Sequence, residues 1–228
     1  MREYDTQLLQ FLGEEGYSHV NLLGLWIQKH PTTVRRYLNR LEEQGYVQPR
    51  ILPSLLQRDL WQLTRHGRLL LCEQSPSYTG PTSVLASLHH LTLQEIRIKA
   101  RNLGYTSWLG ERSCRRLAQE ADPTWPKVPD ALCTTPQGLR LALELELNRK
   151  PVWRYQEAID HYAYLLHEQD IDEVHYLVPP NLLRSLYRLF ETIDSIHLFG
   201  QTWPLPDVLR QHIRVMNLNT WPHAPRPE

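Results

Sequence analysis

The stretch 139-LRLALELELNRK-150 decides which kind of domain the second half of the chain forms. Leucines alternate with other residues through its middle, and successive side chains of a β-strand point to opposite faces. The pattern therefore predicts a strand with one apolar face and one face that carries Glu144 and Glu146. Two like charges on one strand face repel each other. Solvation of a polar face relieves this repulsion, as does a bound cation, and the alternation leaves both interpretations open.

The segment 128-VPDAL-132 lies a short turn before this strand and predicts the other half of a hairpin. If Asp130 ends that neighbouring strand, its carboxylate joins those of Glu144 and Glu146. Three oxygen ligands with open coordination positions suit Mg²⁺ or Mn²⁺. The hairpin is thus a candidate metal site with acidic ligands.

Length and composition set the frame for the rest. The chain has 228 residues, enough for two domains that each bury a core. Its formal net charge is zero, so contact with DNA is expected to be local. The widely spaced Cys72, Cys114 and Cys133 form no zinc pattern and predict reduced thiols in a cytoplasmic protein. With no apolar run long enough for a membrane span and no signal-peptide layout, no membrane partner is expected.

Residues 1–75 predict a first domain made of three helices, a hairpin and a closing helix. The third helix is the informative one, because Val34, Leu38 and Leu41 form an apolar stripe at helical spacing. The stripe leaves a basic face outward, made of Arg35, Arg36, Asn39 and Arg40.

This order, with the segments 41-LEEQGYV-47 and 61-WQLTRHGR-68, resembles many bacterial winged helix-turn-helix domains. Such domains place the third helix in the major groove, so the resemblance implies a double-stranded DNA partner. The wing is expected over residues 48–59. The implied DNA contacts are Thr32, Thr33, Arg35, Arg36, Asn39 and Arg40 on the helix and Arg50 and Arg58 on the wing. A solvated basic helix, or a winged helix that binds protein, is the alternative interpretation.

Turn-forming residues over 76–83 predict a linker, and a second domain is expected over 84–217. It opens with a helix over 84–103 that has Leu85, Leu88 and Ile96 inward. A short strand, the hairpin, a helix over 152–168, a strand over 171–178, a helix capped by Asn181 and a strand over 196–199 follow. The fold class is therefore α+β, with a small mixed sheet in an α/β second domain. The Pro-rich end, 218–228, is expected to be a flexible tail.

Pro129-Asp130 on one strand and Glu144-x-Glu146 on the next resemble the active-site pattern of the PD-(D/E)xK nuclease superfamily. That resemblance implies a restriction-endonuclease-like domain. The sequence departs from the pattern at Glu146, which stands where a lysine is usual. Lys150, at the end of the strand, is then the candidate for the missing cation.

The whole chain more narrowly resembles plasmid mobilisation and replication-relaxation proteins, the mobilisation protein C type of relaxase included. The segments that carry this resemblance are 90-HLTLQE-95, 108-WLGER-112, 128-VPD-130, 144–150, Arg154-Tyr155 and Tyr162. It implies that Asp130 and Glu144 bind Mg²⁺ or Mn²⁺, with Glu95 as an outer ligand. Glu146 would be a third ligand or the base, and Lys150 would stabilise charge on the phosphorane. His90, Glu111, Tyr155 and Tyr162 are further site candidates, the tyrosines as nucleophiles.

Two functions follow from these patterns. The first is a relaxase or endonuclease that binds plasmid origin DNA through the winged helix and nicks it by metal-dependent phosphodiester hydrolysis. The second is a non-catalytic DNA-binding accessory protein or transcriptional regulator with a degenerate nuclease-like core. The acids retained at Asp130, Glu144 and Glu146 favour the enzyme. Other mobilisation or coupling proteins and a homodimer are compatible with either function.

Overall fold

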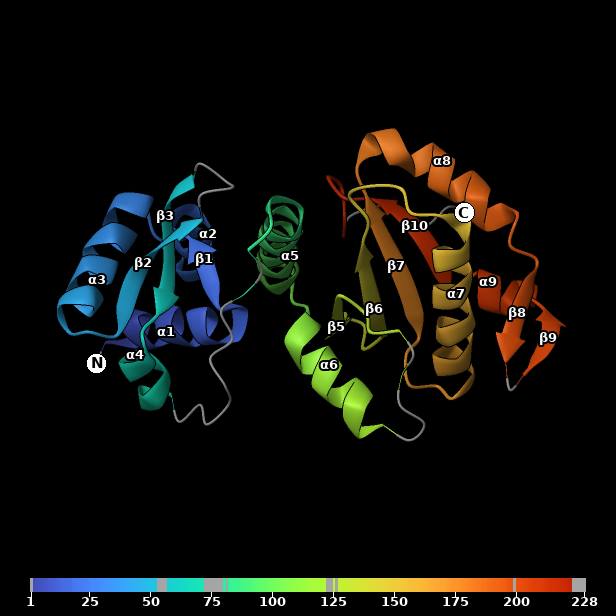
Figure 1. Cartoon of the computed structure of the whole chain (residues 1–228), viewed down its shortest axis with the longest axis horizontal. Coiled ribbons are helices and arrows are strands. Elements are labelled where there is room, and N and C mark those ends of the chain that lie inside the picture. Colours follow the sequence, from blue (N-terminus) through green and yellow to red (C-terminus); the bar gives the residue numbers. More distant parts are fainter. Residues whose placement is uncertain are drawn as a thin grey trace. The chain divides into compact units, whose positions relative to one another are not determined.

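The chain divides into two compact units, Met1–Lys99 and Ala100–Glu228 (Figure 1). The computed structural model describes residues 2–52, 57–71, 80, 82–121, 125, 127–198 and 200–222. Most of the predicted linker over 76–83 lies outside the described residues. The first unit extends beyond that linker, because it includes most of helix α5 (Val84–Asn102).

The first unit has the predicted order of helices and hairpin, with one additional short strand. Its elements before α5 are α1 (Glu3–Glu15), β1 (Tyr17–His19), α2 (Val20–Ile27), α3 (Pro31–Glu43), β2 (Val47–Leu52), β3 (Gln57–Leu63) and α4 (Arg65–Leu70). The three strands form an antiparallel sheet in the order β1-β3-β2. This arrangement of helices, hairpin and closing helix is that of a winged helix-turn-helix, as predicted.

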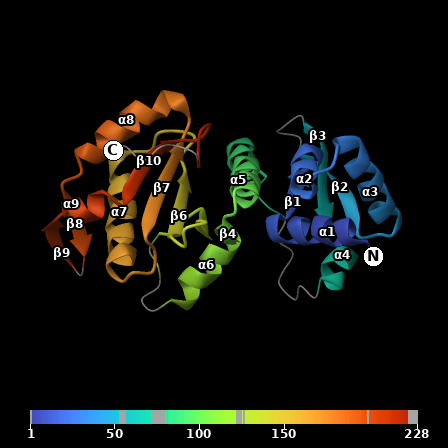
Figure 2. The ribbon, with the colours of Figure 1, turned by 180° about the vertical axis from the view of Figure 1, so that it is seen from behind.

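Helix α3 forms where the sequence predicts it, and its ends show why. Pro31 occupies the first helical turn, where its missing N–H costs nothing, and His30 Nδ1 accepts a hydrogen bond from the Thr32 N–H at 3.3 Å. Val34, Leu38 and Leu41 are fully buried in the core of the unit. The helix lies beside β2 in both views of the ribbon (Figures 1 and 2), and its opposite face meets solvent.

Helix α5 packs on the winged helix through a polar stripe. Gln94 is fully buried, where its Nε2 donates to a backbone carbonyl of β1 at 2.8 Å and its Oε1 accepts from Ser18 Oγ at 2.6 Å. The Arg97 guanidinium binds the neighbouring carboxylates of Glu14 and Glu15. These bonds explain why the first compact unit runs to Lys99.

The predicted inward face at the start of α5 was wrong. Leu85 is 68% exposed and Leu88 is 42% exposed, whereas Ser87 and His90 are buried. Ser87, His90, Gln94 and Arg97 share one side of the helix at intervals of three and four residues, and this side faces the core. Gln94 and Arg97 thus bind the winged helix through polar contacts, and Ile98 adds an apolar contact with its core.

The second unit is an α/β domain around a five-stranded mixed sheet. Its elements after α5 are β4 (Thr106–Gly110), α6 (Glu111–Glu120), β5 (Ala131–Thr134), β6 (Arg140–Leu145), α7 (Val152–His167), β7 (Glu173–Val178), α8 (Pro180–Glu191), β8 (Ser195–Leu198), β9 (Gln201–Pro204), α9 (Asp207–Arg210) and β10 (Ile213–Asn217). The strand order is β10-β7-β6-β5-β4. The pairs β4-β5 and β5-β6 are antiparallel, and the pairs β6-β7 and β7-β10 are parallel.

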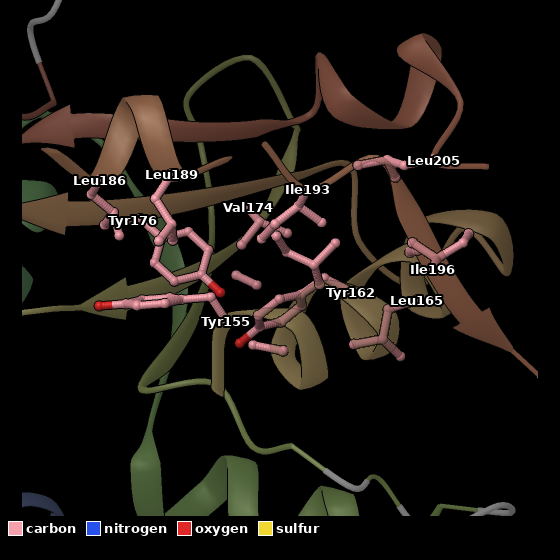
Figure 3. Close-up of a cluster of buried hydrophobic side chains, with 14 of the residues drawn as sticks. Tyr155, Tyr162, Leu165, Val174, Tyr176, Leu186, Leu189, Ile193, Ile196 and Leu205 are labelled. Carbon is pink, nitrogen blue, oxygen red and sulfur yellow. The ribbon is translucent and has the colours of Figure 1, made fainter. Parts of the chain in front are cut away.

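One face of this sheet packs against α7 and α8. Figure 3 shows the core between them, where Tyr155 and Tyr162 of α7 lie near Tyr176 of β7. Ala142 of β6 and Val174 of β7 lie opposite each other in register and belong to the same core. The sequence predicted α7 and β7 to within two residues of their ends.

The end of the chain differs from the prediction. Strand β8 does not join the sheet but pairs with β9 in a separate hairpin, and the sheet position goes to β10 instead. Helix α8 begins at Pro180, and its N-cap Pro179 lies two residues before the predicted cap, Asn181. Trp221 lies in the predicted tail, yet it is buried, and its Nε1 donates to His175 Nδ1 at 3.1 Å. Residues 223–228 of the predicted tail lie outside the described part of the chain.

Candidate functional site

The carboxylates of the predicted hairpin lie inside the second unit. Glu144 is only 2% exposed, and it shares the β6 face that includes Ala142 and packs against α7. The leucines of β6 point to the other face and are equally buried. A central strand of a mixed sheet is covered on both sides. The interpretation of this face as a solvated polar surface was therefore wrong.

Glu144 has two partners from different elements. The hydroxyl of Tyr162 on α7 donates to Oε1 of Glu144, and Nζ of Lys127 lies 2.7 Å from the same oxygen. Lys127 also donates to the carbonyl oxygen of Val128 at 2.8 Å. A buried carboxylate needs such donors, because an unpaired one would lose its hydration without compensation. The three side chains form a buried acid, cation and hydroxyl cluster.

The electrostatics of this cluster bring Glu144 close to half-protonation at neutral pH. Burial, and then the negative charge of Asp130, raise the pKa of Glu144 to about 7, against the opposing effects of Lys127 and Tyr162. Burial, and then the charge of Glu144, raise the pKa of Tyr162 well above its ordinary value. Glu144 therefore releases a proton readily when positive charge arrives next to it.

Asp130 lies where the sequence predicts, directly before β5 and beside β6. Its Oδ2 accepts a hydrogen bond from the Leu145 N–H at 2.8 Å, and its own N–H donates to the Leu143 carbonyl at 3.0 Å. The side chain is half-buried, more open to solvent than that of Glu144. The hairpin thus brings Asp130 and Glu144 together, as expected from the order of the strands.

Glu146 and Lys150 are bound to each other. Lys150 Nζ lies 2.9 Å from Oε2 of Glu146, whose side chain is buried, whereas that of Lys150 is partly exposed. Lys150 was predicted to supply the cation for the acids of the hairpin. Lys150 pairs with Glu146, whereas the ammonium group that binds Glu144 belongs to Lys127.

Sequence reasoning missed Lys127. The signal was present, because Lys127 opens the segment 127-KVPDAL-132, three residues before Asp130. In the nuclease pattern that the hairpin resembles, the lysine follows the second acid, so that pattern does not point to a lysine before the first acid. The segment before β5 brings the amino group to Glu144 from the other strand of the hairpin.

The residues present fit a divalent cation of the Mg²⁺ type. Such an ion is held by one or two carboxylates together with water and substrate phosphates, and Asp130 and Glu144 supply two. Burial, and then repulsion by Asp130, raise the pKa of Glu144, and a bound cation would offset both effects. Within the described part of the chain, no group of three or more His, Cys, Asp or Glu side chains is arranged to hold a metal. A cation here would depend on substrate or water for its remaining ligands.

Nearby, one buried nitrogen is left without a partner. His161 precedes Tyr162 on α7 and is buried, and its Nε2 has no hydrogen-bond partner among the described residues. Burial, and then the charge of Lys127, lower the pKa of His161 to about 4. His161 is therefore neutral at physiological pH and adds no positive charge beside Lys127.

Two acidic candidates have other partners. Glu95, predicted as an outer metal ligand, belongs to the first unit, is exposed, and pairs with Lys99 at 2.9 Å. Glu111 occupies the first turn of α6, where a negative charge is favourable, and binds Arg115 one turn later. Both contacts lie within single helices, and neither carboxylate needs a further ligand.

The remaining three candidates are buried. His90 lies in the first unit with its Nε2 2.9 Å from Nε2 of Gln94. Tyr155 and Tyr162 are at most 1% exposed, and the Tyr155 hydroxyl accepts from the Lys150 N–H at 2.9 Å. In this conformation, no DNA phosphate reaches either tyrosine oxygen, which disfavours a covalent tyrosine mechanism.

The exposed face of α3 carries the predicted DNA contacts. Thr32, Arg35, Arg36 and Asn39 are exposed. Arg35 forms an exposed ion pair with Asp59 at 2.7 Å, and Arg36 donates to Thr33 Oγ1 at 3.3 Å. Exposed ion pairs of this kind contribute little to stability and exchange readily for a phosphate contact.

Two arginines predicted to contact DNA have structural partners instead. Arg40 binds the buried carboxylate of Asp5 on α1 and stacks over Tyr37. Arg50 is buried, with its guanidinium 4.4 Å from the centre of the Tyr17 ring. Both side chains therefore hold the first unit together. The side chain of Arg58 lies outside the described part of the chain.

Fold and site together define a two-unit protein with a winged helix followed by an α/β domain that buries an acidic cluster. A family model described as replication-relaxation matches residues 9–182, which is most of the chain, and the chain belongs to this family. Membership supports a DNA-binding role connected with plasmid replication or mobilisation.

Solved structures also show similarity to part of the chain. A MarR family transcriptional regulator from Silicibacter pomeroyi DSS is 23% identical, with a TM-score of 0.30. The match covers 38% of this chain and 54% of that chain. No curated protein matches the chain. Among the described residues, no helix is both long enough and apolar enough to cross a membrane.

Proposed function

We propose that this protein recognises double-stranded plasmid origin DNA by placing α3 in the major groove. The observation that carries the proposal is the division of α3 into two faces. Val34, Leu38 and Leu41 fix the helix on the core, while arginine, threonine and asparagine side chains occupy the exposed side. Arginine and asparagine are the side chains that bind guanine and adenine edges, and hydroxyl groups bind phosphate.

The test compares two charge-matched double variants of the full chain. Replacing Arg35 and Arg36 by alanine should weaken binding to origin duplex and lower the slope of log K against log salt by about 2, because each phosphate contact contributes about 0.9. The control is Arg184→Ala with Arg188→Ala, which removes the same charge from the exposed side of α8. Equal slopes in the two double variants would exclude α3 from the DNA contact.

We further propose that the second unit nicks the bound DNA at the Asp130–Glu144 cluster. The supporting observation is a half-buried and a buried carboxylate that repel each other beside a lysine. A bound Mg²⁺ or Mn²⁺ would polarise the scissile phosphate and lower the pKa of a water molecule. Asp130 and Glu144 would hold that ion, and Lys127, once freed from Glu144, would offer its ammonium group to the phosphate oxygens.

One observation favours the alternative of a non-catalytic DNA-binding regulator. Lys127 and Tyr162 already bind Glu144, so this acid is satisfied without a metal. In that case, the cluster has only a structural role, in which Glu144 holds α7 on β6. The two functions differ in whether Lys127 leaves Glu144 when a divalent cation and DNA are present.

A plasmid relaxation assay separates them. Supercoiled plasmid that carries the cognate origin is incubated with protein and Mg²⁺ or Mn²⁺, and open-circle product is quantified. Wild type should nick, Asp130→Asn and Glu144→Gln should not, and all three should bind origin duplex equally. Glu120→Gln, which removes an exposed acid from the last turn of α6, is the matched control and should nick like wild type. Nicking by the Asp130 and Glu144 variants would exclude this cluster as the site of cleavage, and no nicking by wild type would leave the regulator as the function.

A further inference from the structure

The segment between β6 and α7 combines positive charge with an exposed aromatic ring. Residues 148-NRKPVWR-154 follow directly after the acids of β6, and every residue among them is exposed. Lys150 is fixed to Glu146, so the segment starts from a defined point at the end of β6. Its position is therefore set by the strand that carries the candidate acids, within the same unit.

Trp153 is the unusual member of this segment. Its side chain is 53% exposed although tryptophan gains more from burial than most side chains. The Arg154 guanidinium lies 4.4 Å from the centre of the indole ring. A cation stacked on one side of an indole holds the ring and leaves its other side free for a second planar group.

The charges around this ring favour an anionic ligand. Arg149 and Arg154 are both exposed, one on each side of Pro151. Helix α7 begins at Val152, and its N-cap Pro151 provides no side-chain hydrogen bond to the first backbone N–H groups. These groups carry the partial positive charge of the helix N-terminus. Two exposed arginines, the positive end of a helix and an aromatic plane together match a polymer of phosphates and flat bases.

We propose that residues 148–154 bind single-stranded DNA, with an unpaired base stacked on Trp153 and adjacent phosphates bound by Arg149 and Arg154. An unpaired base is required because the bases of a duplex are already stacked on their neighbours. The inference rests on the proposed function in one respect: the bound single strand of DNA would be the one that Asp130 and Glu144 cleave. Arginine and aromatic stacking of this kind tolerates any base sequence.

The first test measures binding of fluorescein-labelled oligothymidylate to the full-length protein by anisotropy, in EDTA so that cleavage plays no part. Trp153→Ala should weaken binding roughly fivefold or more, since one stacked base contributes at least that factor. Trp153→Phe keeps a ring and should restore most of the affinity. The matched control is Trp203→Ala, which removes a tryptophan of similar exposure, 51%, from β9 and should bind like wild type.

The second test uses salt. Arg149→Ala and Arg154→Ala should each reduce the slope of log K against log salt by about 0.7, the value for one phosphate of a single strand. Arg184→Ala on α8 should leave the slope unchanged. The variants lie at an exposed segment, and their circular dichroism should match that of wild type.

The outcomes separate this proposal from the proposed function. Wild-type affinity in Trp153→Ala, or equal losses in Trp153→Ala and Trp203→Ala, would overturn the single-strand site even in a protein that nicks its origin. Selective loss in Trp153→Ala with rescue by phenylalanine supports the site even if wild type never nicks. Duplex binding, which depends on α3, should be the same in all of these variants.

Discussion

Glu144 takes its properties from side chains that approach it from both directions along the chain. Lys127 comes from the segment before β5, and Tyr162 comes from α7 after β6. Burial would keep the acid protonated, and the lysine and the hydroxyl oppose that effect. The result is a carboxyl group with a pKa of about 7. It can accept hydrogen bonds from Lys127 and Tyr162 or, once deprotonated, bind a cation.

This pKa predicts how stability depends on pH. Between pH 4.5 and about 7, the folded protein holds the Glu144 proton more tightly than the unfolded chain does, so this contribution to stability is lost as pH rises. A shift of this size corresponds to roughly 3 kcal/mol. Glu144→Gln keeps a neutral, hydrogen-bonding side chain and should remove the loss.

The measurement is urea unfolding of both proteins at a series of pH values. The stability difference between Glu144→Gln and wild type should grow in favour of the variant from pH 4.5 to 7. His161, whose pKa is lowered to about 4, contributes an opposite slope over part of this range, but it does so in both proteins and cancels in the difference. Parallel profiles would show that Glu144 titrates normally.

At the scale of elements, periodicity predicted those parts in which one face is apolar. The apolar stripes of α3 and α7 are correct for this reason. Strand β7 was also predicted, although it is buried on both faces. Periodicity misplaced the start of α5, where Ser87 and His90 are buried and Leu85 is exposed, and the polar face of β6, where Glu144 is buried. In both cases, the stabilising bonds join residues far apart in sequence, and a local pattern contains no information on them.

Short strands were missed for a related reason. β1 has three residues, and β10 has five, of which Ile213 and Val215 face the core with Arg214 between them. Each strand is defined by its partner, β3 for the first and β7 for the second, rather than by its own composition. The site was predicted at Asp130, Glu144 and Glu146 because the hairpin is local. The contact of Lys127 with Glu144 and the burial of the cluster by α7 were not predicted, because they depend on segments outside the hairpin.

The residues after β10 provide a test of the corrected chain end. Trp221 is buried against Tyr105, with ring centres 5.5 Å apart, and donates to His175. Trp221→Ala should therefore destabilise the second unit by about 3 kcal/mol, the usual cost of removing a buried tryptophan. Urea unfolding measures this loss. Thr220→Ala, at an exposed position next to it, should change stability by less than about 0.5 kcal/mol. Equal stability of both variants would show that residues 218–222 form a flexible tail, as predicted from the sequence.

At the scale of the whole molecule, the chain consists of two units, and α5 decides where the first one ends. The sequence suggested a boundary at 76–83 because turn-forming residues gather there. The contacts of Gln94 and Arg97 extend the first unit to Lys99. Composition marks where a chain is able to bend, and long-range bonds determine which residues fold together.

Two fragments test this boundary. Residues 1–102 should unfold in one cooperative transition, and residues 1–82 should be less stable by about 2 kcal/mol or more, because the loss of Arg97 leaves Glu15 without its buried partner. Urea unfolding of both fragments measures the difference. Arg97→Ala in the longer fragment should reproduce part of it, whereas Lys99→Ala should not. Equal stability of the two fragments would return the boundary to 76–83.

The position of Glu144 also has a consequence for the order of events during synthesis. The strands β5 and β6 leave the ribosome before α7 does, and they pair with each other through a short turn. Before Tyr162 has been made and α7 has packed, the helix that covers Glu144 is absent, and we expect water to hydrate this carboxylate. The raised pKa of Glu144 should therefore arise only when the helix that follows it packs on the sheet.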